Sequence, residues 1–317
     1  MEQTIQAGTV TAICISEKRG TQKKPVDTAR LRTDWGIEGD AHAGHWHRQV
    51  SLLSQEEIDA FRAEGADVYP GAFGENLAVQ GIPLKKLPVG TRLQCGSVLL
   101  EVTQIGKDCH SHCTIYYQMG KCIMPSNGIF ARVLQEGEIS VGDTIQVLPE
   151  TGKEPFRAAV ITLSDKGAAG EREDKSGPLA EKLLTEAGYE VVEYLLLPDE
   201  REPLEKELKR LADQRQVHVI FTTGGTGFSV RDITPEATIA VCDRMANGIA
   251  DAIRNYSMTI TPRAMFSRAV SGLRGRTLIV NLPGSPKAVQ EALEYLLPHL
   301  EHGISVLRGN VSECARK

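Results

Sequence analysis

The chain has 317 residues, of which 41% are hydrophobic and 24% are charged, as is typical of globular domains. This length favours two domains, and a net charge of only −5 argues against a nucleic-acid-binding protein. No apolar run is long enough to span a membrane and the first residues lack a signal-peptide pattern, so we expect a cytoplasmic protein whose seven cysteines are thiols or ligands, not disulfides.

Short apolar runs alternate with turn residues in the first half of the chain. Val, Ile, Leu and Thr dominate these runs, which favours a compact β-barrel or sandwich with few helices. The predicted strands lie in residues 9–16, 49–54, 75–82, 91–106 and 143–148. One helix is predicted around residues 54–65, where Ser54 can cap and Glu57 stands three residues on.

A stretch rich in Pro, Gly and charged residues, 148–160, separates the two halves and predicts a linker. We place the boundary near Lys153, which gives a β-rich domain over 1–152 and a second domain over 153–317. In the second half, strands alternate with helices, which predicts an α/β domain with a mostly parallel sheet covered by helices on both faces. The strands are expected at 156–164, 189–198, 218–224 and 276–284, and the helices at 176–188, 201–214, 234–245 and 285–307.

The segment FTTGGTGFSVRDITPEAT (221–238) places three glycines between a predicted strand and a helix capped by Thr234. Such a segment lies at the carboxyl end of its strand, where its N–H groups and the following helix can hold an anion, although a plain tight turn has the same composition. It matches neither the P-loop nor the dinucleotide-binding pattern. For Asp232 the residues leave open a metal ligand, an ion pair with Arg231 and a cap at the helix entry.

The same segment, with residues 161–178, 196–200 and 261–289, resembles the molybdopterin adenylyltransferase family over about residues 156–308. The resemblance implies an enzyme that transfers AMP from Mg-ATP to the terminal phosphate of molybdopterin and releases pyrophosphate. It implies catalytic and Mg²⁺-binding roles for Asp199 and Asp232, with Asp165 as a further metal candidate whose alternative is a cap. The nucleotide-binding residues it implies are Gly224, Gly225, Thr226, Gly227, Pro283, Gly284 and Ser285, and the molybdopterin-binding residues are Ser267, Ser176 and Gly177.

Residues 36–54, 70–77 and 128–148 resemble the MOSC domain, a β-rich module associated with molybdenum-cofactor sulfurases. The resemblance implies a reactive thiolate at Cys109, able to carry sulfur or to bind molybdenum or tungsten. Cys109, Cys113 and Cys122, with His110 and His112, leave three alternatives open: a zinc or iron–sulfur site, a cofactor or sulfur site, and buried residues without a ligand role.

Together, the two resemblances imply molybdenum or tungsten cofactor biosynthesis, in which the first domain handles the product, its metal or its sulfur. The alternatives are a sulfur- or metal-transfer protein and a cofactor carrier, each with a non-catalytic second domain. We expect small-molecule substrates, a trimer formed through the second domain, a molybdenum-insertion partner, and neither nucleic acid nor membrane. Which metal is used and which enzyme receives the cofactor are left open.

Overall fold

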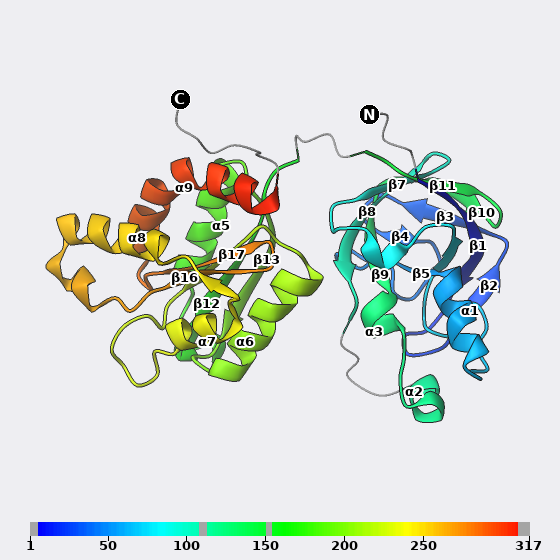
Figure 1. The fold of residues 1–317 in the computed structure, drawn as a ribbon, viewed down its shortest axis with the longest axis horizontal. Coiled ribbons are helices and arrows are strands. Elements are labelled where there is room, and N and C mark those ends of the chain that lie inside the picture. The colour runs from blue at the N-terminus through cyan, green and yellow to red at the C-terminus, as the bar shows by residue number, and fades with distance from the viewer. Residues whose placement is uncertain (1–5, 108–112, 150–153, 310–317) are drawn as a thin grey trace. The chain divides into compact units, whose positions relative to one another are not determined.

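The computed structural model describes residues 6–107, 113–149 and 154–309. The chain divides into two compact units, Met1–Gly152 and Lys153–Lys317 (Figure 1). Within the described ranges, we find no helix with the length and apolar character needed to span a bilayer.

A seven-stranded sheet in the first unit closes into a barrel because β11 pairs with both β7 and β1. Its order is β11-β7-β8-β9-β5-β6-β1, β2 extends it beside β1, and β10-β3-β4 forms a separate small sheet. The strands are β1 (Ala7–Ile15), β2 (Lys24–Val26), β3 (Thr28–Arg32), β4 (Gly36–Ile37), β5 (Val50–Ser54), β6 (Leu77–Gln80), β7 (Arg92–Cys95), β8 (Val98–Ile105), β9 (Ile129–Gln135), β10 (Gly137–Ser140) and β11 (Thr144–Val147).

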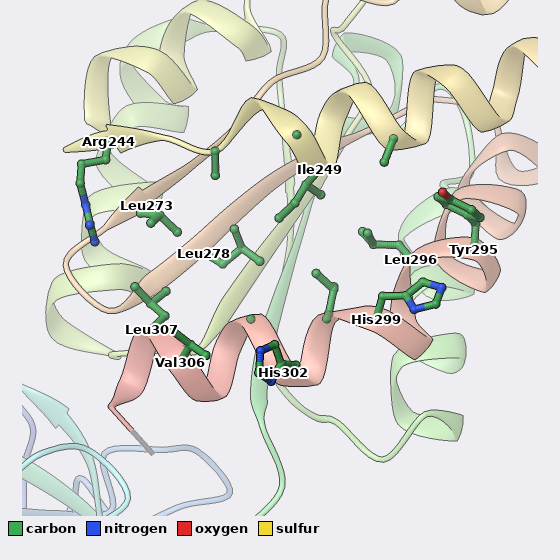
Figure 2. A pocket seen from close by; sticks show the side chains of 15 residues that line it. Arg244, Ile249, Leu273, Leu278, Tyr295, Leu296, His299, His302, Val306 and Leu307 are labelled. Atoms are coloured by element: carbon green, nitrogen blue, oxygen red, sulfur yellow. The ribbon is translucent and has the colours of Figure 1, made fainter. Parts of the chain in front are cut away.

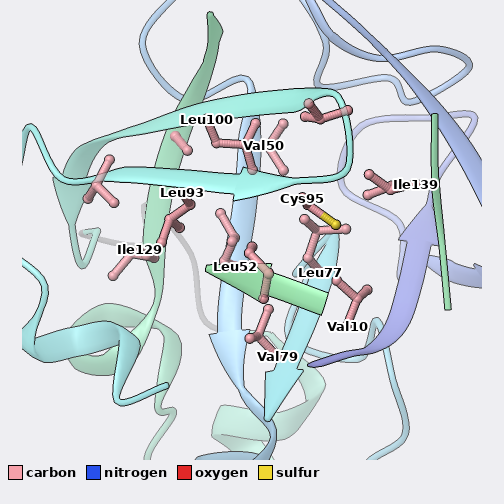
Figure 3. Packing of buried hydrophobic residues seen from close by; sticks show 14 of the residues in the cluster. Val10, Val50, Leu52, Leu77, Val79, Leu93, Cys95, Leu100, Ile129 and Ile139 are labelled. Atoms are coloured by element: carbon pink, nitrogen blue, oxygen red, sulfur yellow. The ribbon is translucent and has the colours of Figure 1, made fainter. Parts of the chain in front are cut away.

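The barrel interior is filled by aliphatic side chains from every strand of the closed sheet. Figure 3 shows Leu52, Leu77, Leu93 and Leu100 pointing toward one another, and all four are at most 1% exposed. Such a filled interior is a packed core and leaves binding to the rim and loops. The short helices are α1 (Gln55–Ala63), α2 (Thr114–Met119), α3 (Met124–Asn127) and the 3₁₀ turn η1 (Leu84–Lys86).

The capping box predicted for α1 is wrong. Ser54 occupies the N-cap position, but its hydroxyl makes no cap hydrogen bond. Instead it donates to the carbonyl of Ile82 (2.9 Å) and accepts from the amide of Leu84, so it joins the helix start to η1.

The second unit is an α/β structure built on a six-stranded mixed sheet of order β13-β12-β14-β17-β16-β15. The pairings of β12 with β13, β12 with β14 and β14 with β17 are parallel, whereas β16 runs antiparallel to β17 and β15. The strands are β12 (Arg157–Leu163), β13 (Glu190–Leu197), β14 (Val219–Thr223), β15 (Arg244–Met245), β16 (Ser271–Arg274) and β17 (Thr277–Leu282). The helices are α4 (Asp165–Ala168), α5 (Ser176–Glu186), α6 (Arg201–Lys209), η2 (Arg210–Gln214, π-helical), α7 (Thr234–Val241), α8 (Asn247–Ile260), η3 (Pro262–Phe266) and α9 (Pro286–Arg308).

Successive residues of the central strands point into two different cores. Val160, Phe221 and Val280 pack with residues of α5, α8 and α9. Ile220 and Ile279 pack with residues of α6 and α7. Figure 1 shows these two helices on the other face of the sheet from α8 and α9. Because the parallel strands run in one direction, their carboxyl ends meet at one edge of the sheet, where polar loops follow them.

Candidate active site

Two aspartates follow neighbouring parallel strands, and the main-chain amide of each donates a hydrogen bond to the carboxylate of the other. Asp165 follows β12, and its amide donates to Oδ2 of Asp199 (3.0 Å). Asp199 follows β13, and its amide donates to Oδ1 of Asp165 (2.9 Å). The parallel register that pairs Leu163 with Leu197 sets this approach, so the fold itself positions both carboxylates.

Arg231 forms a two-pronged ion pair with Asp165, not with Asp232. Its Nε and Nη2 donate to the two carboxylate oxygens of Asp165 at 3.0 and 2.7 Å. The guanidinium holds the pKa of Asp165 below its ordinary value, with the amide of Asp199 adding to that effect. The ion pair considered for Asp232 is therefore made by a different aspartate, and the carboxylate of Asp232 remains available for another role.

Asp199 is the carboxylate whose ionisation is disfavoured. Burial raises its pKa above the ordinary value, and the negative charges of Asp165 and Asp232 raise it further, against hydrogen bonding from the Asp165 amide. Negative charges that disfavour the ionisation of a neighbouring carboxylate form a place where a bound cation is stabilised. Mg²⁺ accepts one or two carboxylates together with substrate phosphates, so the side chains of Asp199 and Asp232 fit that ion.

The glycine loop lies directly against these carboxylates. Gly225 has a φ of +63°, and an added Cβ there would stand 3.2 Å from Oδ1 of Asp199 and 2.4 Å from the hydroxyl of Thr234. That hydroxyl donates to the carbonyl of Gly224 (2.9 Å). Only glycine allows this backbone conformation at so close an approach. Thr234 was expected as the N-cap of α7, but Ile233 occupies that position and Thr234 begins the helix.

Asp232 is fixed by the loop that precedes it. The amide of Ser229 donates to its Oδ2 (2.9 Å), and its own amide donates to the carbonyl of Ser229 (2.9 Å). A Cβ added at Gly227 would stand 2.9 Å from the same oxygen. The carboxylate is thus held by a turn within residues 227–232 and caps no helix.

Arg268 ties the glycine loop to the segment after η3, a role that sequence reasoning missed. Its guanidinium donates to the carbonyls of Gly227 (2.6 Å) and Asp232 (2.6 Å) and to the carboxylate of Glu236. Its amide donates to the carbonyl of Thr226 (2.9 Å). Two of the three groups that accept from the guanidinium of Arg268 are main-chain carbonyls. Every residue type provides such a carbonyl, so no sequence pattern identifies these partners in advance.

Ser176 and Gly177, which were predicted to bind molybdopterin, lie at the start of α5, and their amides already donate hydrogen bonds to Asp174. Its carboxylate accepts from the amide of Ser176 (2.9 Å), the amide of Gly177 and the hydroxyl of Tyr194 (2.5 Å). Burial favours a raised pKa for Asp174, but these hydrogen bonds outweigh it and hold the pKa below the ordinary value. The hydroxyl of Ser176 donates to the carbonyl of Gly284 (2.8 Å), which brings α5 to the loop after β17.

The loop after β17 joins the same edge of the sheet. Thr223 at the end of β14 donates to the carbonyl of Pro283 (2.7 Å). Ser285 caps α9 by accepting from the amide of Ala288, while it stays exposed. Ser267 follows η3 and accepts weakly from the amide of Ala269 (3.3 Å), so its hydroxyl is only lightly engaged. The structure thus gathers the loops that carry the predicted residues at one edge.

A hollow of about 730 Å³ lies at the opposite end of β17 (Figure 2). It begins at Leu278 on β17 and is lined chiefly by apolar side chains of α8, β16 and α9, with His299 and His302 at its wall. Pro283 stands five positions after Leu278, which is roughly 16 Å of extended chain. The hollow is therefore separate from the carboxylates and glycines of the candidate site.

The first unit holds a buried ion pair behind its histidine-rich loop. The ammonium of Lys23 lies 2.7 Å from both carboxylate oxygens of Asp40, and the two side chains are 2% and 0% exposed. The amide of Ser16 also donates to Asp40 (2.9 Å), while His42 lies 3.5 Å from the lysine. The pair anchors the start of the loop that carries His42, His45 and His47.

The thiolate candidate Cys109, with His110 and His112, lies outside the described residues. Cys113 is exposed at the start of α2, and Cys122 is half-buried beside the core under α1. Among the residues that the structure describes, no group of three His, Cys, Asp or Glu side chains could hold a metal ion. Cys109 is not among these residues, so its assignment as a thiolate stays a prediction.

The second unit is an α/β domain whose parallel strands end in clustered carboxylates and glycine loops. Residues 159–302 match the family model described as "Probable molybdopterin binding domain", and residues 39–146 match the MOSC domain. Molybdopterin adenylyltransferases that are 38–39% identical to this chain match it over 77–91% of their own length, so the chain belongs to that family and carries a MOSC domain ahead of that family's domain, which confirms both resemblances.

Individual relatives match the second unit. A molybdopterin adenylyltransferase of Helicobacter pylori strain J99 is 38% identical over 160 residues, which cover 50% of this chain and 91% of that protein. The Escherichia coli K12 molybdopterin adenylyltransferase is 39% identical over 159 residues, with 49% and 77% covered. Among solved structures, the molybdopterin biosynthesis enzyme MoaB of Thermus thermophilus shares 45% identity over 49% of this chain and 97% of that one, with a TM-score of 0.47.

Proposed function

We propose that the second unit transfers AMP from Mg-ATP to the terminal phosphate of molybdopterin and releases pyrophosphate. The observation that carries this proposal is the contact of the glycine loop with Asp199 and Asp232 at the carboxyl edge of the sheet. Nucleotidyl transfer needs phosphate positioning and charge neutralisation more than covalent help from the protein. The kinship with named molybdopterin adenylyltransferases supports the same activity.

In this proposal, Asp199 and Asp232 hold Mg²⁺, which when bound supplies the positive charge that offsets the developing charge on phosphate. Asp165 positions Asp199 through the paired main-chain hydrogen bonds and keeps Arg231 beside the site. N–H groups of Gly224, Gly225, Thr226 and Gly227 face the nucleotide phosphates, and the N-terminus of α9 at Ser285, after Pro283 and Gly284, adds a second set of donors.

We assign molybdopterin to the side of the site next to Ser267. Its hydroxyl is lightly engaged and can turn to a ligand, whereas the hydroxyl of Ser176 and the amide of Gly177 already have partners within the chain. We therefore give Ser176 and Gly177 a positioning role through α5 and the Gly284 loop. Ser267→Ala should then weaken molybdopterin use more than ATP binding.

For the first unit, we propose that the MOSC domain receives the adenylylated product, its metal or its sulfur, with Cys109 as the thiolate. The guanidinium of Arg48 and the ammonium of Lys107 both lie against the ring of Phe130, at 5.6 and 5.9 Å from its centroid. This pair of cations suits an anionic product. Cys109→Ser should remove retained metal or sulfur while AMP transfer continues, because the two units have separate cores.

Pyrophosphate release by the full chain with molybdopterin and Mg-ATP tests the proposal. Release that depends on all three components supports it, and a chain that binds molybdopterin without release would instead be a carrier. Molecular mass in solution tests the trimer that we propose for the active form.

A further inference from the structure

Two phenylalanine rings stand exposed at the edge of the candidate site. Phe228 is 69% exposed and Phe266 is 52% exposed, yet the rings meet edge to face, with centroids 5.4 Å apart and planes at 69°. One ring belongs to the glycine loop and the other to η3, 38 residues further along the chain. Large apolar side chains left in solvent as a contacting pair mark a surface that a ligand or partner covers.

The main chains beneath both rings are held rigidly. Arg268, two residues after Phe266, donates to the carbonyl of Gly227, which precedes Phe228, and its amide donates to the carbonyl of Thr226. Each ring is therefore attached to a segment that the same arginine fixes. A preorganised apolar surface loses little freedom when a ligand covers it.

The position of the pair favours a small ligand of the site. Phe228 stands between Gly227, whose Cα lies against the carboxylate of Asp232, and Ser229, whose amide donates to that carboxylate. Phe266 directly precedes Ser267. The rings thus border the catalytic carboxylate on one side and the serine assigned to molybdopterin on the other.

We propose that Phe228 and Phe266 form the apolar seat of the planar pterin ring of molybdopterin, which stacks on one of the two rings and meets the other at its edge, because their planes cross at 69°. The inference rests on the proposed function, and it adds the residues that recognise the heterocycle to those that hold phosphates. Aromatic faces bind flat heterocycles by stacking, whereas the carboxylates and glycine amides beside them serve the charged part of the reaction. The adenine of ATP is assigned no part of this seat.

Binding of molybdopterin, followed without oxygen by the fluorescence of its pterin ring, tests the seat in the full chain. Phe228→Ala and Phe266→Ala should each weaken binding about tenfold, the loss expected for one stacked ring. Phe228→Tyr, which keeps a ring, and Val230→Ala, at a residue 98% exposed in the same loop, should stay within about twofold of the parent. Affinity for a non-hydrolysable ATP analogue, measured by calorimetry with Mg²⁺, should not change in any variant.

Unchanged molybdopterin affinity in both alanine variants would overturn the seat. So would an equal loss of nucleotide affinity, or a change in molecular mass in solution, which would make the rings a contact between chains. If the parent binds molybdopterin but releases no pyrophosphate, the proposed activity fails while the comparison of variants still decides the seat. If the parent releases pyrophosphate and the variants bind normally, only the seat fails, and a parent that binds no molybdopterin would refute both.

Discussion

Asp165 and Asp199 exchange main-chain hydrogen bonds with each other's carboxylates, at 3.0 and 2.9 Å. Both donors are main-chain amides, and the register of the two parallel strands brings each amide to the other residue's carboxylate. The exchange holds Asp199 beside Gly225 and leaves Asp165 bound to Arg231. The sheet therefore positions the carboxylates of the candidate site without a bound ligand.

Replacing Asp232 by Asn should lower the rate of AMP transfer by about 10²–10³-fold, the typical cost of losing one group that stabilises developing charge. The fold should survive, because the amide of Ser229 that donates to the side chain of residue 232 can still donate to an amide oxygen. Steady-state pyrophosphate release measures the change, and Asp251→Asn on the exposed face of α8 is the matched control. Turnover within a few-fold of the parent would show that Asp232 has no catalytic role.

Arg268→Lys should raise the KM for both substrates and lower the free energy of unfolding by about 1–3 kcal/mol, since one ammonium cannot replace the planar fork that reaches two carbonyls and Glu236. Kinetics together with urea unfolding measure both effects. Arg263→Lys, in the exposed turn η3, is the control. A variant with the parent's kinetics and stability would mean that the loops keep their position without this arginine.

The pKa of Asp199 should fall in Asp165→Asn. Burial raises this pKa first, but the charge of Asp165 is one of the contributions that raise it further, and the substitution removes that charge while Arg231 stays near. Because Mg²⁺ needs the ionised carboxylate, Mg²⁺ affinity of the parent should decline on acidification at a higher pH than for an ordinary aspartate, whose pKa is about 3.9. Carbon NMR of the carboxyl group measures the pKa, and a rise in the variant would contradict the account.

The Lys23–Asp40 pair should show strong coupling in unfolding. Asp40→Asn leaves a buried ammonium without its carboxylate and should cost about 3–5 kcal/mol, whereas Lys23→Met combined with Asp40→Leu should cost much less than the sum of the single changes. Both tryptophans, Trp35 and Trp46, lie in the first unit, so their fluorescence reports its unfolding in the full chain. Additive losses would mean that the pair contributes no interaction energy of its own.

The spacing of apolar residues, together with the glycines and prolines between apolar runs, made the class of each domain and many of its strands and helices predictable. The predicted strands around residues 9–16 and 218–224 and the helix at 285–307 correspond to β1, β14 and α9. In the second unit, β16 and α8 were not predicted, and the helix expected at 234–245 ends at Val241, because residues 244 and 245 form β15, a strand too short to show a period. In the first unit, β2, β3, β4, β9 and β10 were not predicted either. The N-cap residue of α8 is Ala246, whose side chain makes no capping hydrogen bond, so the start of this helix has no capping signal in the sequence.

The candidate site could be predicted only in part, because the contacts that position its residues leave no pattern in the sequence. Asp165, Asp199 and Asp232 follow strands or glycine loops, but it was the resemblance to the family that implied their roles, because the residues alone left other roles open. Their partners depend on contacts far apart in the chain, such as Arg231 with Asp165, 66 residues away. Others are main-chain groups, such as those that bind Arg268, and these leave no mark on the sequence.

The most direct test of the central claim follows the transferred group itself. The full chain is incubated with molybdopterin, Mg²⁺ and ATP labelled in its α-phosphate, and the label on molybdopterin is measured beside the pyrophosphate released. The account predicts one labelled AMP on molybdopterin for each pyrophosphate, and loss of both in Asp232→Asn. Pyrophosphate without labelled molybdopterin, or equal labelling by the Asp232→Asn variant, would contradict it.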